Sequence, residues 1–329
     1  MKIFIFLLRA LKAIYLKSSQ IVFRIHKKQT QQYQKYVELS DQSANDFIRE
    51  LLETGKPCMI SKFGTIELSA LEQYWSLHQK RYSLKDIYDY ITCKRFTLWW
   101  PKMGGVNALC SNAGFFPNNF ELLGEYYEIN ISAIRNIDVL GSYLYSEKYF
   151  SEELKQAKRV NLDGYYAPYF FKNPWTTALK NKKILVVHPF YRDIRSQYEL
   201  SSQLWKDPSV LPDFELITYT SIQSMLGIKT PYRTWFEALN KMKQDIANID
   251  FDIAIIGCGA YGMPLASFVK NLGKQAIHMA GWTQVLFGII GKRWEDDVRF
   301  NDIINDYWVH PSKEDIPENA KKIEGGCYW

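Results

Sequence analysis

A short segment near residue 60 combines residue types that suit nucleotide chemistry. Lys62, Gly64, Thr65 and Glu67 lie in SKFGTIE, directly after apolar residues that indicate a buried strand. Ligands of open α/β sheets bind at the carboxyl ends of strands. We therefore expect Glu67 to act as a general base or to hold a divalent metal ion, Mn²⁺ or Mg²⁺, and Lys62 to meet a phosphate. The alternative is that Glu67 is an ordinary acid of a helix's first turn, favoured there by the helix dipole.

A second candidate group follows another apolar run. His188 ends this run, and Arg192 and Arg195 come just after it in HPFYRDIRSQY. Because the planar guanidinium group matches phosphate oxygens, the two arginines could grip a diphosphate beside His188. The alternative is that they are surface residues that pair with the nearby acids Asp193 and Glu199.

Three glycines form the motif GCGAYG between an expected strand and an expected helix, at Gly257, Gly259 and Gly262. Such a turn is typical of phosphate binding, since glycine lets the backbone approach the ligand. A nicotinamide dinucleotide site also requires an acid about 20 residues further on. The next strand ends in residues 278–282, HMAGW, without one. We therefore expect no NAD, and the glycines either meet a sugar-nucleotide phosphate or permit tight packing of strand against helix.

The elements that must position these residues are apparent in the apolar runs. Strands are expected at 57–64, 136–145, 159–163, 183–189, 214–219, 251–256 and 275–279. Their alternation with helical segments predicts an α/β fold, a Rossmann-like doubly wound and mostly parallel sheet with helices on both faces. The expected organisation is a basic amphipathic N-terminal helix at 1–30, a polar linker at 31–45, a first α/β half at 46–180 and a second Rossmann-like half at 181–329. A solvated helix is the alternative for the polar segment, and an amphipathic helix is expected at 43–52.

Composition narrows the class of protein. The 329 residues are 47% hydrophobic and carry a formal charge of +6, without the dense basic stripes of a nucleic-acid binder, so we expect no nucleic-acid partner. The five cysteines are odd in number and form no CxxC pair, which favours a reducing, cytoplasmic location.

The N-terminal segment bears on membrane association. Its apolar run, residues 3–8, is too short to span a bilayer, and no signal-peptide cleavage site follows it. Because Arg9, Lys12 and Lys17 stand among apolar residues, the segment could lie as a helix on a membrane surface. The alternative is an ordinary helix docked on the protein's own core.

The segment 62–67, KFGTIE, resembles a motif of the bacterial GT-D type glycosyltransferases. Their early strand ends in an Arg-Phe/Tyr-Gly-Asp-Gly-Glu type sequence, and its acidic pair is implicated in the metal and sugar-nucleotide site. The resemblance continues at 184–189, 253–266 and 273–277, and so spans residues 45–285. It implies a Rossmann-like fold in which Lys62 stands for the arginine and Glu67 for the second acid. Thr65 replaces the first acid, so a metal site built on that pair would lack one carboxylate.

The resemblance implies a glycosyltransferase that uses a nucleotide-sugar donor. The expected acceptor is a glycan or lipid-linked glycan of bacterial capsule, O-antigen or exopolysaccharide biosynthesis, at the inner face of the plasma membrane. One alternative is another transferase of the same pathway, for pyruvyl or phosphosugar groups, which donor screening would separate. Another is a non-catalytic scaffold of a polysaccharide assembly complex, which the loss of the acid at Thr65 makes reasonable.

Overall fold

The centre of the protein is a seven-stranded sheet, seen in a computed structural model that describes residues 2–22, 36–79, 81–99, 103–318, 320, 326 and 328–329. The strand order is β3-β2-β1-β7-β6-β4-β5, and each of the described strand pairs is parallel. The predicted fold class, a Rossmann-like α/β sheet with helices on both faces, is confirmed. The strands are β1 (Cys58–Lys62), β2 (Val139–Gly141), β3 (Lys158–Val160), β4 (Lys183–His188), β5 (Glu215–Thr220), β6 (Ile253–Ile256) and β7 (Gln275–His278).

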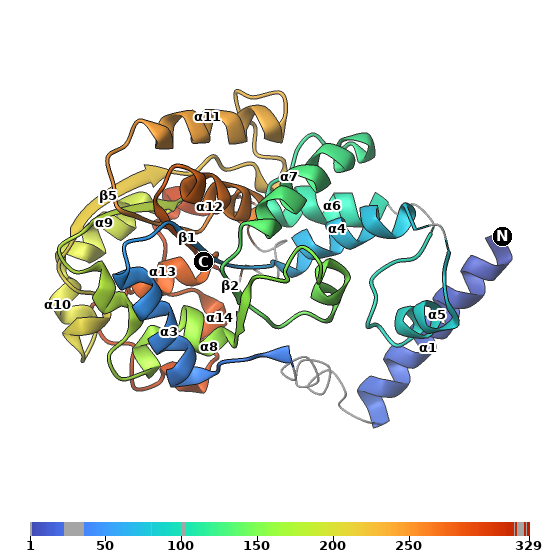
Figure 1. The fold of residues 1–329 in the computed structure, drawn as a ribbon, viewed down its shortest axis with the longest axis horizontal. Helices are drawn as coiled ribbons and strands as arrows, with labels where there is room; N and C mark the ends of the chain where they lie inside the picture. Colours follow the sequence, from blue (N-terminus) through green and yellow to red (C-terminus); the bar gives the residue numbers. More distant parts are fainter. Residues whose placement is uncertain are drawn as a thin grey trace.

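Helices cover both faces of the sheet because the central strands are apolar on both sides. Along β4, Leu185 and Val187 face one hydrophobic core, whereas Ile184 and Val186 face the other. The first core packs against α4 (Thr65–Leu77), α6 (Met103–Ala113), α7 (Leu123–Arg135), α11 (Trp235–Ala247) and α12 (Gly262–Asn271) (Figure 1). The second packs against α3 (Asp41–Glu53), α8 (Leu162–Tyr166), α9 (Tyr191–Glu199), α10 (Ser201–Leu204), α13 (Trp282–Leu286) and α14 (Lys292–Glu295).

Short 3₁₀ helices occupy many of the connections. They lie at Phe120–Leu122, Tyr145–Phe150, Pro168–Phe170, Trp175–Leu179, Pro208–Val210, Met225–Gly227, Gly259–Tyr261, Val298–Phe300 and Lys313–Asp315. The turn at Gly259–Tyr261 leads directly into α12, so the GCGAYG segment joins strand to helix as the sequence predicts.

The two predicted halves, 46–180 and 181–329, contribute to one sheet. They meet where β1 pairs with β7, with Cys58 opposite Gln275 and Ile60 opposite Ile277. The predicted linker is wrong for its described part, 36–45, while 31–35 lie outside the described residues. Leu39 bridges β3, and α3 begins at Asp41 with Ala44 fully buried. Polar residues cap and flank this helix, which gave the segment its linker-like composition.

The N-terminal helix is present as α1 (Lys2–Val22), whereas residues 23–30 lie outside the described part of the chain. It packs beside α5 (Leu84–Ile91) at one end of the molecule, beyond the sheet (Figure 1). Leu8 meets Tyr90 and Leu98 there in a small separate core. Within the described residues, no helix has the length and apolar character needed to cross a membrane.

Candidate functional site

The topology of the sheet places a crevice at its carboxyl edge. Strands β4 and β6 are neighbours, but the helices that follow them, α9 and α12, lie on opposite faces. The same holds for the neighbours β1 and β7, which are followed by α4 and α13. Chain segments that leave in opposite directions open a gap above the strand ends, where α/β proteins bind ligands.

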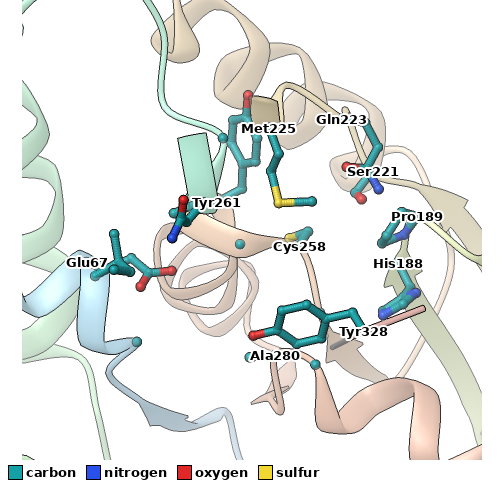
Figure 2. A pocket seen from close by; sticks show the side chains of 18 of the residues that line it. Glu67, His188, Pro189, Ser221, Gln223, Met225, Cys258, Tyr261, Ala280 and Tyr328 are labelled. Atoms are coloured by element: carbon teal, nitrogen blue, oxygen red, sulfur yellow. The ribbon is translucent and has the colours of Figure 1, made fainter. Parts of the chain in front are cut away.

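A cleft with a cavity volume of about 210 Å³ lies at these strand ends. In Figure 2, Glu67 lies on one side of it and His188 on the other, with Cys258 and Tyr328 between them. The lining residues follow or end six strands, and include Lys62, Tyr143, His188, Ser221, Gly257 and His278. The fold thus brings Lys62, Glu67, His188 and the glycine turn to one edge of the sheet.

Glu67 lies in the first turn of α4, whose N-cap is Gly64. Its carboxylate folds back over Gly64, and a side chain at that glycine would overlap both carboxylate oxygens. The Glu67 carboxylate also acts on Tyr143. Burial raises the pKa of Tyr143, and the negative charge of Glu67 raises it further. Glu67 is therefore both a first-turn acid of a helix and a half-buried carboxylate of the cleft.

Lys62 and Thr65 also line the cleft, and both lie beside Tyr143. The Lys62 ammonium group lies 5.6 Å from the centre of the Tyr143 ring, and the Thr65 hydroxyl lies 3.5 Å from the Tyr143 hydroxyl. Tyr143 in turn donates a 2.8 Å hydrogen bond to the Phe63 carbonyl. Sequence reasoning missed Tyr143, although its place near the end of the expected strand at 136–145 was a usable signal.

His188 is a neutral hydrogen-bond donor at the end of β4. Burial lowers its pKa to about 3, so the imidazole carries no charge at neutral pH. Its Nδ1 accepts a 3.1 Å hydrogen bond from the Phe190 backbone N–H, which leaves the proton on Nε2. An imidazole in this tautomer can donate to an oxygen atom of a ligand, and it carries no positive charge of its own.

His278, at the end of β7, is a cleft residue that the sequence did not reveal. Burial lowers its pKa to about 3, and the charge of Lys62 adds to this effect. Its Nδ1 lies 3.1 Å from the Ser61 hydroxyl. Its Nε2 has no hydrogen-bond partner among the described residues and is directed at Gly262. The ring of His278 thus packs directly against Gly262 of the glycine turn.

The buried imidazole of His188 predicts a pH dependence of stability. Below pH 6.5 the unfolded chain takes up a proton at this residue that the folded chain refuses until about pH 3. The free energy of unfolding should therefore fall as pH drops through this window, by up to about 1.4 kcal/mol per pH unit for one histidine. Urea unfolding measures this free energy. Between pH 6.5 and about pH 4, we expect it to decrease less steeply with falling pH in His188→Gln than in the unaltered protein. Equal slopes for the two proteins would contradict a neutral, buried His188.

The three glycines of the turn are explained by close packing. A side chain at Gly257 would lie 2.5 Å from the Ala280 carbonyl, and one at Gly259 would lie 2.7 Å from the Ala113 carbonyl. One at Gly262 would overlap the ring of His278. Of the two interpretations left open by the sequence, tight packing accounts for these positions, while Gly257 and Gly259 also line the cleft.

The structure does not bring Arg192 and Arg195 to the cleft. Both lie exposed on α9, whose inward positions are Ile194 and Gln197, and neither is among the lining residues. The alternative, in which these arginines pair with Asp193, is not seen among the described residues either. Asp193 instead accepts a hydrogen bond from the Ser312 backbone N–H. The helical period explains the difference, because residues at i and i+3 share a face and here that face points to solvent.

Arg293 lines the cleft instead, beside Tyr328. Its guanidinium carbon lies 4.6 Å from the centre of the Tyr328 ring, and it donates a 3.3 Å hydrogen bond to the Tyr328 hydroxyl. Sequence reasoning missed both residues because the C-terminal region has no hydrophobic period that would place it. Lys62 and Arg293 are thus the two cationic side chains among the described lining residues.

The described lining residues do not form a metal site by themselves. Glu67 is the one carboxylate among them, and the described residues include no cluster of three or more His, Cys, Asp or Glu side chains suited to an ion. Mg²⁺ requires near-octahedral oxygen coordination, which one carboxylate does not supply without oxygens from a ligand. Glu67 as a ligand of Mn²⁺ or Mg²⁺ stays a prediction.

Neither a protein-family model nor a curated protein nor a solved structure matches this chain. The described cleft residues combine one side-chain carboxylate, Glu67, two cationic side chains, Lys62 and Arg293, and the neutral donor His188. They lie at the crevice where the helices after neighbouring strands leave on opposite faces of the sheet. Such a set of groups suits a ligand with a compact negative charge and several hydroxyl groups.

Proposed function

We propose that the protein is a glycosyltransferase, which moves a sugar from a nucleotide-sugar donor to a hydroxyl group of a glycan. The observation that carries this proposal is Glu67, the one side-chain carboxylate among the described lining residues, whose other charged members, Lys62 and Arg293, are cationic. A nucleotide-sugar matches this arrangement, since its diphosphate needs cations and its hydroxyl groups need polar partners. The resemblance of residues 62–67 to the GT-D type glycosyltransferases supports the same activity.

In the proposed reaction, Glu67 accepts the proton of the acceptor hydroxyl as that oxygen bonds to the anomeric carbon of the donor sugar. The bond between this carbon and the diphosphate oxygen breaks, and the nucleoside diphosphate leaves with the electron pair. Lys62 and Arg293 stabilise the negative charge that grows on the diphosphate. The Nε2–H of His188 supplies a further hydrogen-bond donor without adding charge.

The proposed acceptor is a growing glycan of a bacterial surface polysaccharide, carried on a lipid at the cytoplasmic side of the membrane. An acceptor of this kind fits a cleft that opens at one edge of the sheet, where a long chain can enter from solvent.

Thermal shift with a panel of nucleotide-sugars, with and without Mn²⁺ or Mg²⁺, tests the donor. A ligand that binds the native state raises the melting temperature, so one nucleotide class should stabilise the protein. Incubation of that donor with a glycan acceptor should then release the nucleoside diphosphate. Stabilisation by a pyruvyl or phosphosugar donor, and by none of the nucleotide-sugars, would favour the other transferase class instead.

Replacement of Arg293 tests the placement of the diphosphate. A hydrogen bond to a charged group contributes about 1.5–3 kcal/mol, so Arg293→Ala should raise KM for the donor by roughly tenfold or more. The melting temperature should change little, because the side chain is exposed. Arg195→Ala is the matched control, since this exposed arginine of α9 lies outside the cleft lining, and its KM should match the unaltered protein. A raised KM in Arg195→Ala, with an unchanged KM in Arg293→Ala, would instead favour the arginines of α9 as residues that bind the donor.

A further inference from the structure

Helix α1 carries two apolar faces, and the protein itself covers one of them. Ile5, Leu8 and Lys12 recur at helical spacing on the covered face. Leu8 is buried against Tyr90 and Leu98, with Ile5 packed at the edge of this cluster. The Lys12 ammonium group donates hydrogen bonds to the Arg95 and Phe96 carbonyls, at 3.2 and 3.4 Å. The helix is thus held in a fixed orientation rather than tethered loosely.

The second apolar face is open to solvent. Ile3, Leu7, Leu11 and Ile14 recur at i, i+4, i+8 and i+11, and all four are exposed. At 100° per residue this face lies roughly 140° round the helix from the covered one. Ile3 is 77% exposed, Ile14 63%, and Phe6 at the edge of this face 70%. Single exposed apolar residues are ordinary, but a continuous apolar stripe on one helix marks an interaction surface.

Charge identifies what this stripe meets. Residues 2–22 contain Lys2, Arg9, Lys12 and Lys17 and no acidic residue. On the helix, Lys2, Arg9 and Lys17 lie along one flank, between the covered face and the exposed one. An apolar face bordered by basic residues is typical of helices that lie in the interface of a bilayer with anionic lipids. The neighbouring helix α5 also has two exposed apolar side chains at i and i+4, Leu84 at 86% and Tyr88 at 57%.

We propose that the exposed face of α1 docks the protein on a membrane surface that contains anionic phospholipid. The apolar side chains Ile3, Phe6, Leu7, Leu11 and Ile14 enter the boundary between head groups and acyl chains, while the basic flank meets phosphate groups. Because α1 is fixed on α5 and the segment 82–99, docking also fixes the orientation of the whole molecule on the membrane. This proposal is independent of the proposed transferase activity, although a lipid-linked acceptor would make the two work together.

Sedimentation with lipid vesicles tests the docking surface, with no donor or acceptor present. The unaltered protein should bind vesicles of phosphatidylglycerol and phosphatidylcholine far better than vesicles of phosphatidylcholine alone. A triple variant, Ile3→Ser, Phe6→Ser and Ile14→Ser, removes exposed apolar groups and should weaken binding at least ~10-fold. High salt should weaken binding by the unaltered protein, since the charges of this surface are screened.

A matched control replaces exposed apolar residues of other elements, with Ile228→Ser, Leu272→Ser and Val298→Ser, and should bind vesicles like the unaltered protein. Equal binding by the α1 variant and this control would overturn the proposal, as would equal binding to both kinds of vesicle. Sedimentation equilibrium without lipid tests the alternative that a second copy of the chain binds this face of α1. A dimer that the α1 variant abolishes would assign this face to a second copy of the chain, and would also overturn the proposal.

Discussion

Glu67→Gln is expected to lower kcat of sugar transfer by about 10²–10⁴-fold, the range for loss of a general base. Glutamine preserves the shape of the side chain but cannot accept a proton from the acceptor hydroxyl. The melting temperature should stay close to that of the unaltered protein, because the side chain is only half-buried in the first turn of α4. Initial rates of nucleoside diphosphate release measure this effect. Glu121→Gln, an exposed acid outside the cleft, is the matched control and should keep full activity.

A second variant separates a chemical role of Glu67 from a structural one. Gly64→Ala places a methyl group where the carboxylate lies, so Glu67 must move while the backbone conformation stays accessible to alanine. This variant should lose activity, and the double variant with Glu67→Gln should lose little more, since both changes remove the same carboxylate from the cleft. Normal turnover by Glu67→Gln would contradict its role as base and would favour the scaffold alternative.

Gly259→Ala is expected to lower the free energy of unfolding by about 3 kcal/mol, from two separate causes. The residue has φ of +57°, a left-handed conformation that costs alanine roughly 1–2 kcal/mol. The added methyl group would also lie 2.7 Å from the Ala113 carbonyl, which belongs to the backbone of α6 and cannot rotate away. Urea unfolding of both proteins at one temperature gives the difference.

Gly55→Ala is the control for this effect. Gly55 has φ of +67°, but a side chain there would meet no atom within 4 Å. Its replacement therefore carries the left-handed cost alone, roughly 1–2 kcal/mol. If Gly259→Ala lowers the free energy of unfolding no more than Gly55→Ala does, the turn can move away from α6. That result would contradict the tight packing of Gly259 against the Ala113 carbonyl.

The sequence predicted the strands well because their signal is local. Each of the seven expected strands overlaps one of the seven described strands, from Cys58–Lys62 to Gln275–His278, with β3 and β5 shifted by one residue. A strand buried on both faces needs apolar residues at successive positions, and this composition is visible without knowledge of any partner strand. The common edge of Lys62, Glu67 and His188 follows from the same logic, since parallel strands bring their carboxyl ends together.

Local patterns failed where the surroundings of a residue decide its role. Arg192 and Arg195 follow a strand end as a phosphate-binding pair would, but the period of α9 turns them to solvent. The linker predicted at 31–45 has a polar composition, yet Leu39 bridges β3 and α3 already begins at Asp41. In each case the choice of face depends on what packs against the helix, which the segment itself does not encode.

By itself, the sequence determined the alternation of strands and helices, the position of a carboxylate and glycines at strand ends, and a basic, apolar N-terminal helix. Only the tertiary structure decided which groups share the cleft. Arg293 and Tyr328 reach it from the far end of the chain, and the close approach of Ala113, His278 and Ala280 leaves no room for a side chain at the GCGAYG glycines. It also decided which face of α1 stays exposed. The physical reason is that strand and helix formation depends on residues close in sequence, whereas a site is made by contacts between segments that only the packed chain brings together.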